Sequence, residues 1–220
     1  MNQASAAAAT SPAVIVRALG LQDYEPLWRA MQSFTEQRAA ETPDEIWFTE
    51  HPPVFTLGMN ASAEHLLAPG DIPVVQIDRG GQVTYHGPGQ LLIYPLIDLR
   101  RSALGVRDLV TALEQSAIAT AADYGLRANS RADAPGVYVA GMKIASVGLR
   151  VRRGASFHGM AFNVAMDLEP FSRINPCGFS DLRVIDLSGL GVTASLSEVR
   201  ERMSVHLQRH LWGGSPDRSD

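Results

Sequence analysis

The residues of this chain that could do covalent chemistry are one thiol and one lysine in an unusual setting. Cys177 is the single cysteine of 220 residues and lies between Pro176 and Gly178. Because structural cysteines usually lie in apolar surroundings, this turn-like setting favours an accessible nucleophile. Lys143 lies in an apolar, strand-like run, where a buried ammonium is costly without a partner. Beside the sulfur it would lower the thiol pKa from about 8.5 and could move protons during acyl transfer.

Other interpretations of these residues stay open. Lys143 could extend to the surface, as long charged side chains often do, and Cys177 could be an inert packing residue. His86 and His158 each precede a glycine, and either could pair with the thiol, since histidine is the commoner thiolate partner, or orient a substrate carbonyl. A metal site is not indicated, because the helical pair of His206 and His210 has no other ligands nearby in sequence.

A glycine-dense segment, residues 79–90, is the second chemical signal. Glycines allow a close approach of the backbone to a ligand and permit positive φ. The spacing matches neither a phosphate loop nor a dinucleotide-binding fingerprint. Because Arg79, Tyr85, His86 and Gln90 are interleaved with the glycines, a ligand-binding loop is favoured over a plain turn between strands.

Composition limits the class of protein. The length fits one domain with a sizeable core, and 45% apolar with 19% charged residues is typical of a globular chain. A single cysteine excludes an internal disulfide framework and suits a reducing compartment, so we expect a cytoplasmic protein. Residues 1–12, rich in Ala and Ser, are expected to be a disordered tail rather than a signal peptide, and residues 213–220 a flexible one.

Charge is unevenly distributed, although the net charge is only −4. Residues 1–78 carry 3 basic and 10 acidic side chains, whereas residues 79–107 carry 4 and 1, and residues 143–173 carry 5 and 2. The two basic stretches contain the motifs above. A basic rim built from some of Arg100, Arg101, Arg150, Arg152 and Arg153 could attract an acidic partner; a mixed solvated surface is the alternative.

Hydrophobic periodicity predicts the elements that must position these residues. Helices are expected over 24–40, capped by Asp23, over 106–124, closed by Gly125, and from a capping box at Ser195 to about Leu211. Strands are expected at 13–17, 46–48, 54–57, 74–77, 91–99, 137–139, 143–151 and 157–165. This order predicts one α/β domain of the α+β type, spanning residues 13–212, with a mixed sheet flanked by helices.

Several motifs in a fixed order resemble one known family. They are residues 79–90, 131–138, 143–144, 148–150, 157–159 and 173–178. Together they resemble the octanoyltransferases of lipoate biosynthesis (the LipB type), over about residues 46–180. The resemblance implies the fold of the biotin and lipoate protein ligase catalytic domains.

The resemblance also implies an activity and a set of site residues. The implied reaction is octanoyl transfer from octanoyl–acyl carrier protein to a lysine of lipoyl domains, such as those of 2-oxoacid dehydrogenases and the glycine cleavage H protein. In this family the cysteine matching Cys177 carries the acyl thioester and the lysine matching Lys143 tunes it. Three segments match those that contact substrate: Arg79, Gly80, Gly81, Gln82, Val83, Thr84, Tyr85 and His86; Ser146, Val147 and Gly148; and Gly159, Met160 and Ala161.

The implied mechanism needs no cofactor, since the donor is already a thioester, and neither a nucleic acid nor a membrane is expected as a partner. An ATP-dependent lipoate or biotin ligase of the same fold is one alternative, although no adenylate-binding loop is recognisable. A non-catalytic module that binds an acyl carrier is another.

Overall fold

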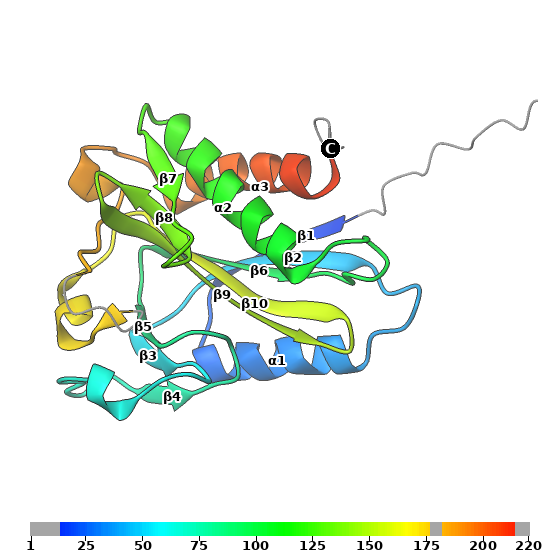
Figure 1. Ribbon diagram of the computed structural model, residues 1–220, viewed down its shortest axis with the longest axis horizontal. Coiled ribbons are helices and arrows are strands. Elements are labelled where there is room, and N and C mark those ends of the chain that lie inside the picture. The colour runs from blue at the N-terminus through cyan, green and yellow to red at the C-terminus, as the bar shows by residue number, and fades with distance from the viewer. Residues whose placement is uncertain (1–13, 177–181, 214–220) are drawn as a thin grey trace, which may run out of the picture.

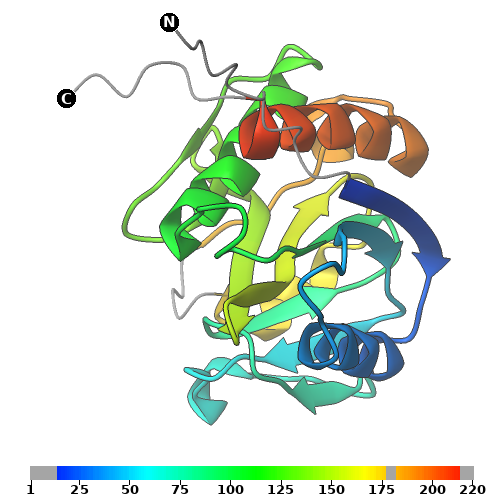
Figure 2. The same cartoon turned by 90° about the vertical axis from the view of Figure 1, so that its right-hand side faces the viewer.

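The computed structural model describes residues 14–176 and 182–213. A seven-stranded sheet forms its centre (Figure 1). Helices α2 (Val106–Ala122) and α3 (Leu196–Trp212) cover one face, and α1 (Tyr24–Glu36) lies on the other (Figure 2). A second, three-stranded sheet lies on the α1 side of the molecule.

Both sheets are mixed. The large sheet has the order β1 (Val14–Leu21), β2 (Asp44–Glu50), β6 (Gln90–Leu96), β10 (Ala155–Asn163), β9 (Met142–Arg152), β8 (Gly136–Val139) and β7 (Ala128–Ser130). Only the β1–β2 pair in it is parallel. The small sheet has the order β4 (Val74–Gln76), β3 (Val54–Leu57) and β5 (Val83–His86). Short 3-10 helices lie in the connections: η1 (Ala63–His65), η2 (Glu169–Arg173) and η4 (Ser188–Leu190).

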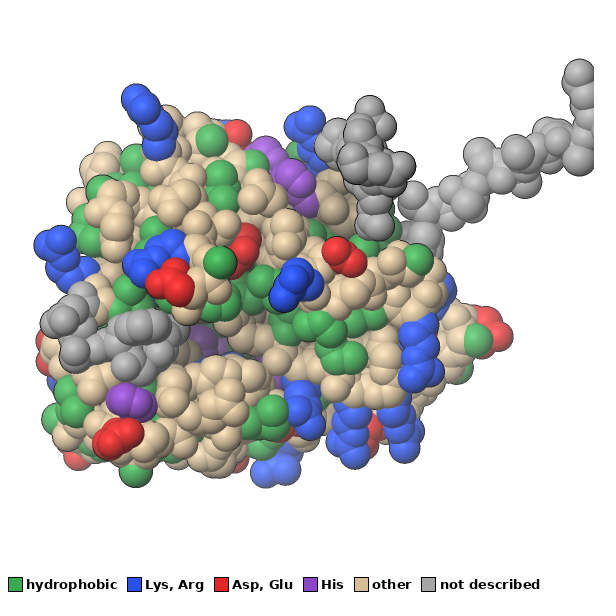
Figure 3. Space-filling view, viewed as in Figure 1, with side chains coloured by type: hydrophobic (Ala, Val, Ile, Leu, Met, Phe, Trp, Pro, Cys, Tyr) green, Lys and Arg blue, Asp and Glu red, His purple; other side chains and the backbone are tan. Residues whose placement is uncertain are grey.

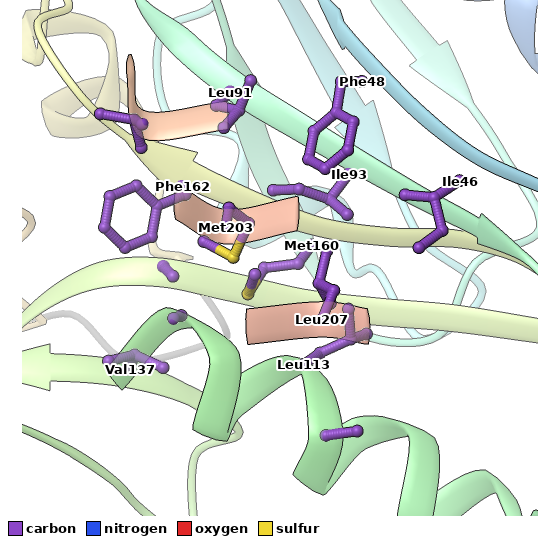
Figure 4. Packing of buried hydrophobic residues seen from close by; sticks show 14 of the residues in the cluster. Ile46, Phe48, Leu91, Ile93, Leu113, Val137, Met160, Phe162, Met203 and Leu207 are labelled. Atoms are coloured by element: carbon purple, nitrogen blue, oxygen red, sulfur yellow. The ribbon is translucent and has the colours of Figure 1, made fainter. Parts of the chain in front are cut away.

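The main core fills the space between the large sheet and the helix pair α2 and α3. Leu113 of α2 and Met203 and Leu207 of α3 pack toward Ile93 and Met160 of the central strands (Figure 4). All five side chains are buried to within 1% exposure. Truncating one such side chain to alanine typically costs about 2–5 kcal/mol, so this packing fixes β6 and β10 against the helices.

The opposite face of the same strands packs against α1. Leu27 and Met31 of this helix meet Leu92, Tyr94 and Phe157. Because β-strand side chains alternate between the two faces, both faces of β6 are apolar, and the whole strand is buried. The continuous apolar run that predicted a buried strand is thereby explained.

The three predicted helices are present, and the mixed α/β class is confirmed. Helix α1 ends at Glu36, earlier than the predicted Ala40, since Arg38 turns inward to Asp44. Asp23 is the N-cap residue but makes no side-chain capping bond. The predicted capping box is confirmed: Ser195 Oγ accepts from Glu198 N at 3.2 Å, and Ser195 N donates to Glu198 Oε2 at 2.7 Å.

The predicted strands are present, with differences in extent. Two further strands, β5 and β7, were not predicted. Strand β6 ends at Leu96 rather than Leu99, because Asp98 N turns to the buried carboxylate of Asp44. The prediction of a loop throughout 79–90 is wrong at residues 83–86, which form β5 against β3. Pairing between distant segments, rather than local propensity, decides such short strands. Residues 1–12 and 214–220 of the predicted tails lie outside the described residues, whereas Gly213, the first residue of the predicted C-terminal tail, is the C-cap residue of α3.

Asp44 forms a buried ionic cluster that changes the picture of the basic rim. Its carboxylate is fully buried and binds the guanidinium groups of Arg38 and Arg101, the latter at 2.6 Å. It also accepts from Asp98 N at 2.9 Å. Arg101, one of the five candidates for the rim, directs its guanidinium to this buried carboxylate. Arg152, another rim residue, pairs with Glu36 at the surface.

Replacing Asp44 with Ala is expected to destabilise the fold strongly, because it leaves two arginines without their shared buried counter-ion. The loss should be about 3–5 kcal/mol, measured by urea denaturation. Glu36→Ala is the control, since it removes a half-exposed ion pair and should cost about 0–1 kcal/mol. Equal losses in the two variants would contradict the role assigned to burial.

Candidate active site

A pocket opens between the large sheet and the small one. It encloses about 520 Å³, a volume that includes space open to solvent at its mouth. Figure 3 shows a hollow between the part of the molecule built on α2 and the part built on the small sheet, with histidine at its bottom. Its lining includes the apolar residues Leu92, Val147 and Met160.

The structure brings the three predicted substrate segments together around this pocket. Its wall contains Arg79, Gly80, Gly81, Gln82, Val83, Thr84, His86, Ser146, Val147, Gly148, Gly159, Met160 and Ala161. The antiparallel register of β9 and β10 places Gly148 opposite Gly159. The glycine-dense segment joins them because Gly80 N donates to Leu149 O at 3.0 Å.

Tyr85 is the one predicted substrate residue of these segments that is absent from the wall. Its ring packs against Phe55 and Phe171, with ring centroids 5.5 Å apart in both pairs. Because side chains alternate along β5, Thr84 and His86 point to the other side. Tyr85 therefore belongs to a small apolar core beneath the pocket.

Two of the wall glycines make close contacts with neighbouring segments. A Cβ at Gly148 would lie 3.1 Å from both Gly80 O and Arg79 Cδ, and a Cβ at Gly159 would lie 2.0 Å from Ile93 O. The first contact is tight, so a side chain at Gly148 would make the glycine-dense segment shift by a few tenths of an ångström. The second leaves no room for a side chain, so Gly159 is needed for the close approach of β10 to β6, whatever ligand contacts the wall makes.

Tyr94 of the pocket wall shares a directed hydrogen bond with His51, which lies behind it. His51 Nδ1 is 2.7 Å from Gln22 O, a carbonyl that can only accept, so Nδ1 carries the proton. Its Nε2 therefore accepts from Tyr94 Oη at 2.8 Å. Burial lowers the pKa of His51 to about 4, so the ring is neutral near pH 7. Any further contact of Tyr94 Oη must be as an acceptor.

His86 is fixed in one tautomer by a chain of amide side chains. Asn163 Nδ2 donates to Ile185 O at 2.9 Å, which turns Asn163 Oδ1 toward Gln90 Nε2, also at 2.9 Å. Gln90 Oε1 then accepts from His86 Nδ1 at 2.7 Å. Burial lowers the pKa of His86 to about 3, so its Nε2 is an acceptor.

The series of hydrogen bonds continues beyond His86, through Thr56, to Arg79. Its guanidinium donates to Thr56 Oγ1 at 3.0 Å and to Thr56 O at 2.8 Å. The Thr56 hydroxyl can therefore donate to His86 Nε2 at 3.3 Å. Arg79 also donates to Gly80 O at 2.9 Å. Some of the N–H donors of Arg79 thus hold β3 and the glycine-dense segment in place.

His158 differs from the other two histidines. It has φ of 56°, which is uncommon for a residue other than glycine, and its Nε2 lies 3.0 Å from Asp78 Oδ1. Although burial opposes ionisation, the hydrogen bonds from His158 and Trp28 hold the pKa of Asp78 at about 2. Asp78 is therefore ionised, and His158 Nε2 donates to it.

This tautomer leaves Nδ1 of His158 without a proton. Burial lowers the pKa of His158, so Nδ1 of the neutral ring has a lone pair. It is buried and has no hydrogen-bond partner among the described residues, and His158 lines the pocket. Such a nitrogen can accept from a substrate N–H or O–H group, whereas orienting a substrate carbonyl, one predicted role, would need a donor.

Sequence reasoning missed three wall residues: Tyr24, Leu92 and Tyr94. Tyr94 had a usable signal, since a hydroxyl within a wholly buried strand needs a partner. Tyr24, at the start of α1, had none. Its ring stacks on His86 with centroids 5.7 Å apart, a contact made only by folding.

Lys143 is 1% exposed and does not extend to the surface. Its Nζ donates to Pro135 O at 3.1 Å and lies 5.3 Å from the centroid of the Tyr138 ring. It is not a wall residue, but it lies three positions before Ser146 on β9. Cys177 lies outside the described residues. The chain that follows it pairs with Lys143, whose N–H donates to Arg183 O at 2.8 Å.

The described residues, 14–176 and 182–213, contain neither a metal cluster nor a membrane-spanning helix. No group of three or more His, Cys, Asp or Glu side chains among them could hold a metal ion. No helix in the same residues is long and apolar enough to span a bilayer.

Sequence comparison identifies the family. Residues 23–208 match the model of the lipoyl protein ligase A/B catalytic domain. An octanoyltransferase of Pseudomonas syringae pv. syringae is 60% identical over 195 residues, covering 89% of each chain. An octanoyltransferase of Hahella chejuensis is 64% identical over 174 residues, covering 79% of this chain and 78% of its own.

Comparison of structures gives the same fold at low identity. A lipoate-protein ligase A bound with ATP matches with a TM-score of 0.72 at 15% identity, over 92% of this chain and 86% of its own. A biotin protein ligase from Aquifex aeolicus, in complex with biotin and ATP, matches with a TM-score of 0.54 at 13% identity, over 90% and 70%. The predicted biotin and lipoate ligase fold is confirmed.

The chain belongs to the lipoyl protein ligase A/B catalytic-domain family and, within it, to the octanoyltransferases. It is accordingly an enzyme of the transferase class.

The buried histidines predict an acid-sensitive fold. The folded pKa values of His51 and His86, about 4 and about 3, lie below the ordinary value of about 6.5. The unfolded chain therefore binds more protons below pH 6.5, and their contribution to stability, complete above that pH, is lost as pH falls toward 4 and then 3. Each ring should add about 1.4 kcal/mol per pH unit to the slope between pH 6 and 5.

Urea denaturation at pH 7.5, 6.0, 5.5 and 5.0 measures this slope. The variant His51→Gln should lower it by the share of one ring. The control Gln208→Ala, at an exposed position of α3, removes no titratable group and should leave the slope unchanged. An unaltered slope in His51→Gln would contradict the assignment of a neutral buried ring.

Proposed function

We propose that this chain is a lipoyl(octanoyl) transferase that moves an octanoyl group, or a lipoyl group, from acyl carrier protein to a lysine of lipoyl domains through a thioester on Cys177. This would be the first step of endogenous lipoate synthesis. The observation that carries the proposal is the buried amine of Lys143, three residues from the pocket wall and paired with the chain that follows Cys177.

The proposed reaction has two acyl transfers. The Cys177 thiolate attacks the carbonyl of the octanoyl thioester, and the pantetheine sulfur leaves as a thiol after taking a proton. The acceptor lysine amine then attacks the octanoyl–Cys177 thioester, an amide forms, and Cys177 leaves. The first exchange is nearly isoenergetic because both bonds are thioesters, whereas the amide drives the second. No ATP is consumed.

Lys143 would support both steps through its charge and its protons. An ammonium beside a thiol favours the thiolate, and the same group can return a proton to the leaving sulfur. The octanoyl chain would occupy the pocket enclosed by the three predicted segments. In the second step His158 Nδ1 offers an acceptor for a substrate N–H group.

The proposed partners are octanoyl–acyl carrier protein, the lipoyl domains of 2-oxoacid dehydrogenase E2 subunits and the glycine cleavage H protein, in the cytoplasm. Arg100, Arg150 and Arg153 are the members of the predicted rim for which no carboxylate partner lies within 4 Å among the described residues. Attraction of an acidic carrier would rest on these. Neither nucleic acid nor membrane is part of the proposal.

The proposed mechanism predicts a covalent intermediate. Wild-type protein mixed with octanoyl–acyl carrier protein and no ATP should gain the mass of one octanoyl group, and Cys177→Ala should gain none and lose transfer. Intact-protein mass spectrometry measures the adduct. Consumption of ATP with free octanoate would instead indicate a ligase, and neither adduct nor ATP consumption would indicate a binding module.

The second prediction concerns Lys143. Lys143→Met should slow alkylation of Cys177 by iodoacetamide near neutral pH, since the thiolate loses its neighbouring charge. Turnover should fall by roughly two or more orders of magnitude. Equal alkylation rates in wild type and variant across pH 6–10 would refute the electrostatic role.

A further inference from the structure

Glu114 is a buried carboxylate that the proposed reaction does not use. It lies on α2, is 9% exposed, and accepts a hydrogen bond from Gly136 N at 2.8 Å. Burial raises the pKa of Glu114, although the Gly136 N–H and the charge of Lys143 oppose the increase. A buried carboxylate is costly to maintain without compensation. The hydrogen bond from Gly136, at the start of β8, supplies part of that compensation and connects Glu114 to the chain around Lys143.

The bonded N–H of Gly136 belongs to the same peptide group as Pro135 C=O. No cis peptide occurs among the described residues, so the carbonyl and the N–H of this planar group point in opposite directions. Lys143 Nζ donates to the carbonyl at 3.1 Å, and Glu114 Oε1 accepts from the N–H at 2.8 Å. One amide therefore connects the carboxylate with the ammonium, and hydrogen bonds in such a chain strengthen one another.

The turn that carries this amide is held tightly. Tyr138 Oη donates to Ala134 O at 2.7 Å, and the Tyr138 ring lies beneath Lys143 Nζ. Gly136 has φ of 134°, and a Cβ there would lie 2.4 Å from Ala145 O and 3.3 Å from Lys143 Cε. Only glycine lets this peptide and the lysine stem share the space, so a small movement of the turn would displace the amine.

We propose that Glu114 is a positioning residue for Lys143, acting through the Pro135–Gly136 peptide. The carboxylate holds the N–H, the peptide holds its carbonyl toward Lys143 Nζ, and the amine is thereby kept at one place beside the pocket. The inference rests on the proposed function of Lys143 for its catalytic consequence, but the hydrogen-bond relay itself does not depend on that function.

Two substitutions separate the bond from the bulk of the side chain. In Glu114→Gln the amide oxygen can still accept from Gly136 N–H, whereas in Glu114→Ala nothing can. Single-turnover octanoyl transfer should fall about tenfold or more in Glu114→Ala, equivalent to about 1.4 kcal/mol, with little change in KM for the carrier. Glu114→Gln should retain a rate within about threefold of wild type, a loss of less than about 0.7 kcal/mol. Similar rates in the two variants would overturn the proposal.

A cycle with Lys143→Met distinguishes positioning from a general loss of structure. In that background Glu114→Ala should have no further effect on the residual rate, because the group that it positions is gone. A full additional tenfold loss would mean that Glu114 acts elsewhere. Ser116→Ala is the matched control, since Ser116 is a buried polar residue of the same helix whose hydroxyl bonds to Ala112 O; it should leave the rate unchanged.

Amide hydrogen exchange of Gly136, followed by NMR, tests the relay without any activity. Exchange should be about tenfold faster or more in Glu114→Ala, as expected for an amide that loses about 1.4 kcal/mol of protection, and close to wild type in Glu114→Gln. Unchanged exchange in Glu114→Ala would overturn the relay even if turnover fell. If exchange responds as expected while Cys177→Ala still transfers octanoyl groups, the relay stands and the proposed function fails.

Discussion

The site depends on one constraint, the close approach of three backbone segments at glycine positions. β10 can approach β6 because Gly159 has no side chain, and the glycine-dense segment packs tightly against β9 at Gly148. Without these contacts the segments at 79–86, 146–148 and 159–161 would not surround one pocket. The sheet register, the core on both faces of β6 and the position of α1 all support this convergence.

A second layer of order comes from hydrogen bonds between buried polar groups. Each series of hydrogen bonds begins at a backbone carbonyl or an ionised carboxylate, which can only accept. That first acceptor sets the donor and acceptor at every later step toward the pocket. Gln22 O fixes His51 and Tyr94, Ile185 O fixes the chain ending at His86, and Asp78 fixes His158. The three histidines are thus neutral near pH 7, and the accepting nitrogen is Nε2 in His51 and His86 but Nδ1 in His158.

The fold itself does not select the reaction. Ligases bound with ATP share it at 13–15% identity, so the sheet and its helices are a common support. What separates the proposed transfer from ATP-dependent activation is one thiol and the chain around it. A buried amine fixed by its own strand, by the 183–185 chain and by the Pro135 carbonyl is the feature of this chain that fits thiol chemistry.

The sequence by itself determined the helices, most strands, the mixed α/β class and nearly the whole pocket wall. These follow from local periodicity, from capping residues such as Ser195 and Glu198, and from motifs that resemble a known family. Only the tertiary structure decided that Tyr85 belongs to the core, that β5 is a strand, that Tyr24 and Tyr94 reach the pocket and that Arg101 turns inward to Asp44. The physical reason is that side-chain direction and the pairing of distant charges depend on register and packing between segments far apart in the chain, which local sequence patterns do not encode.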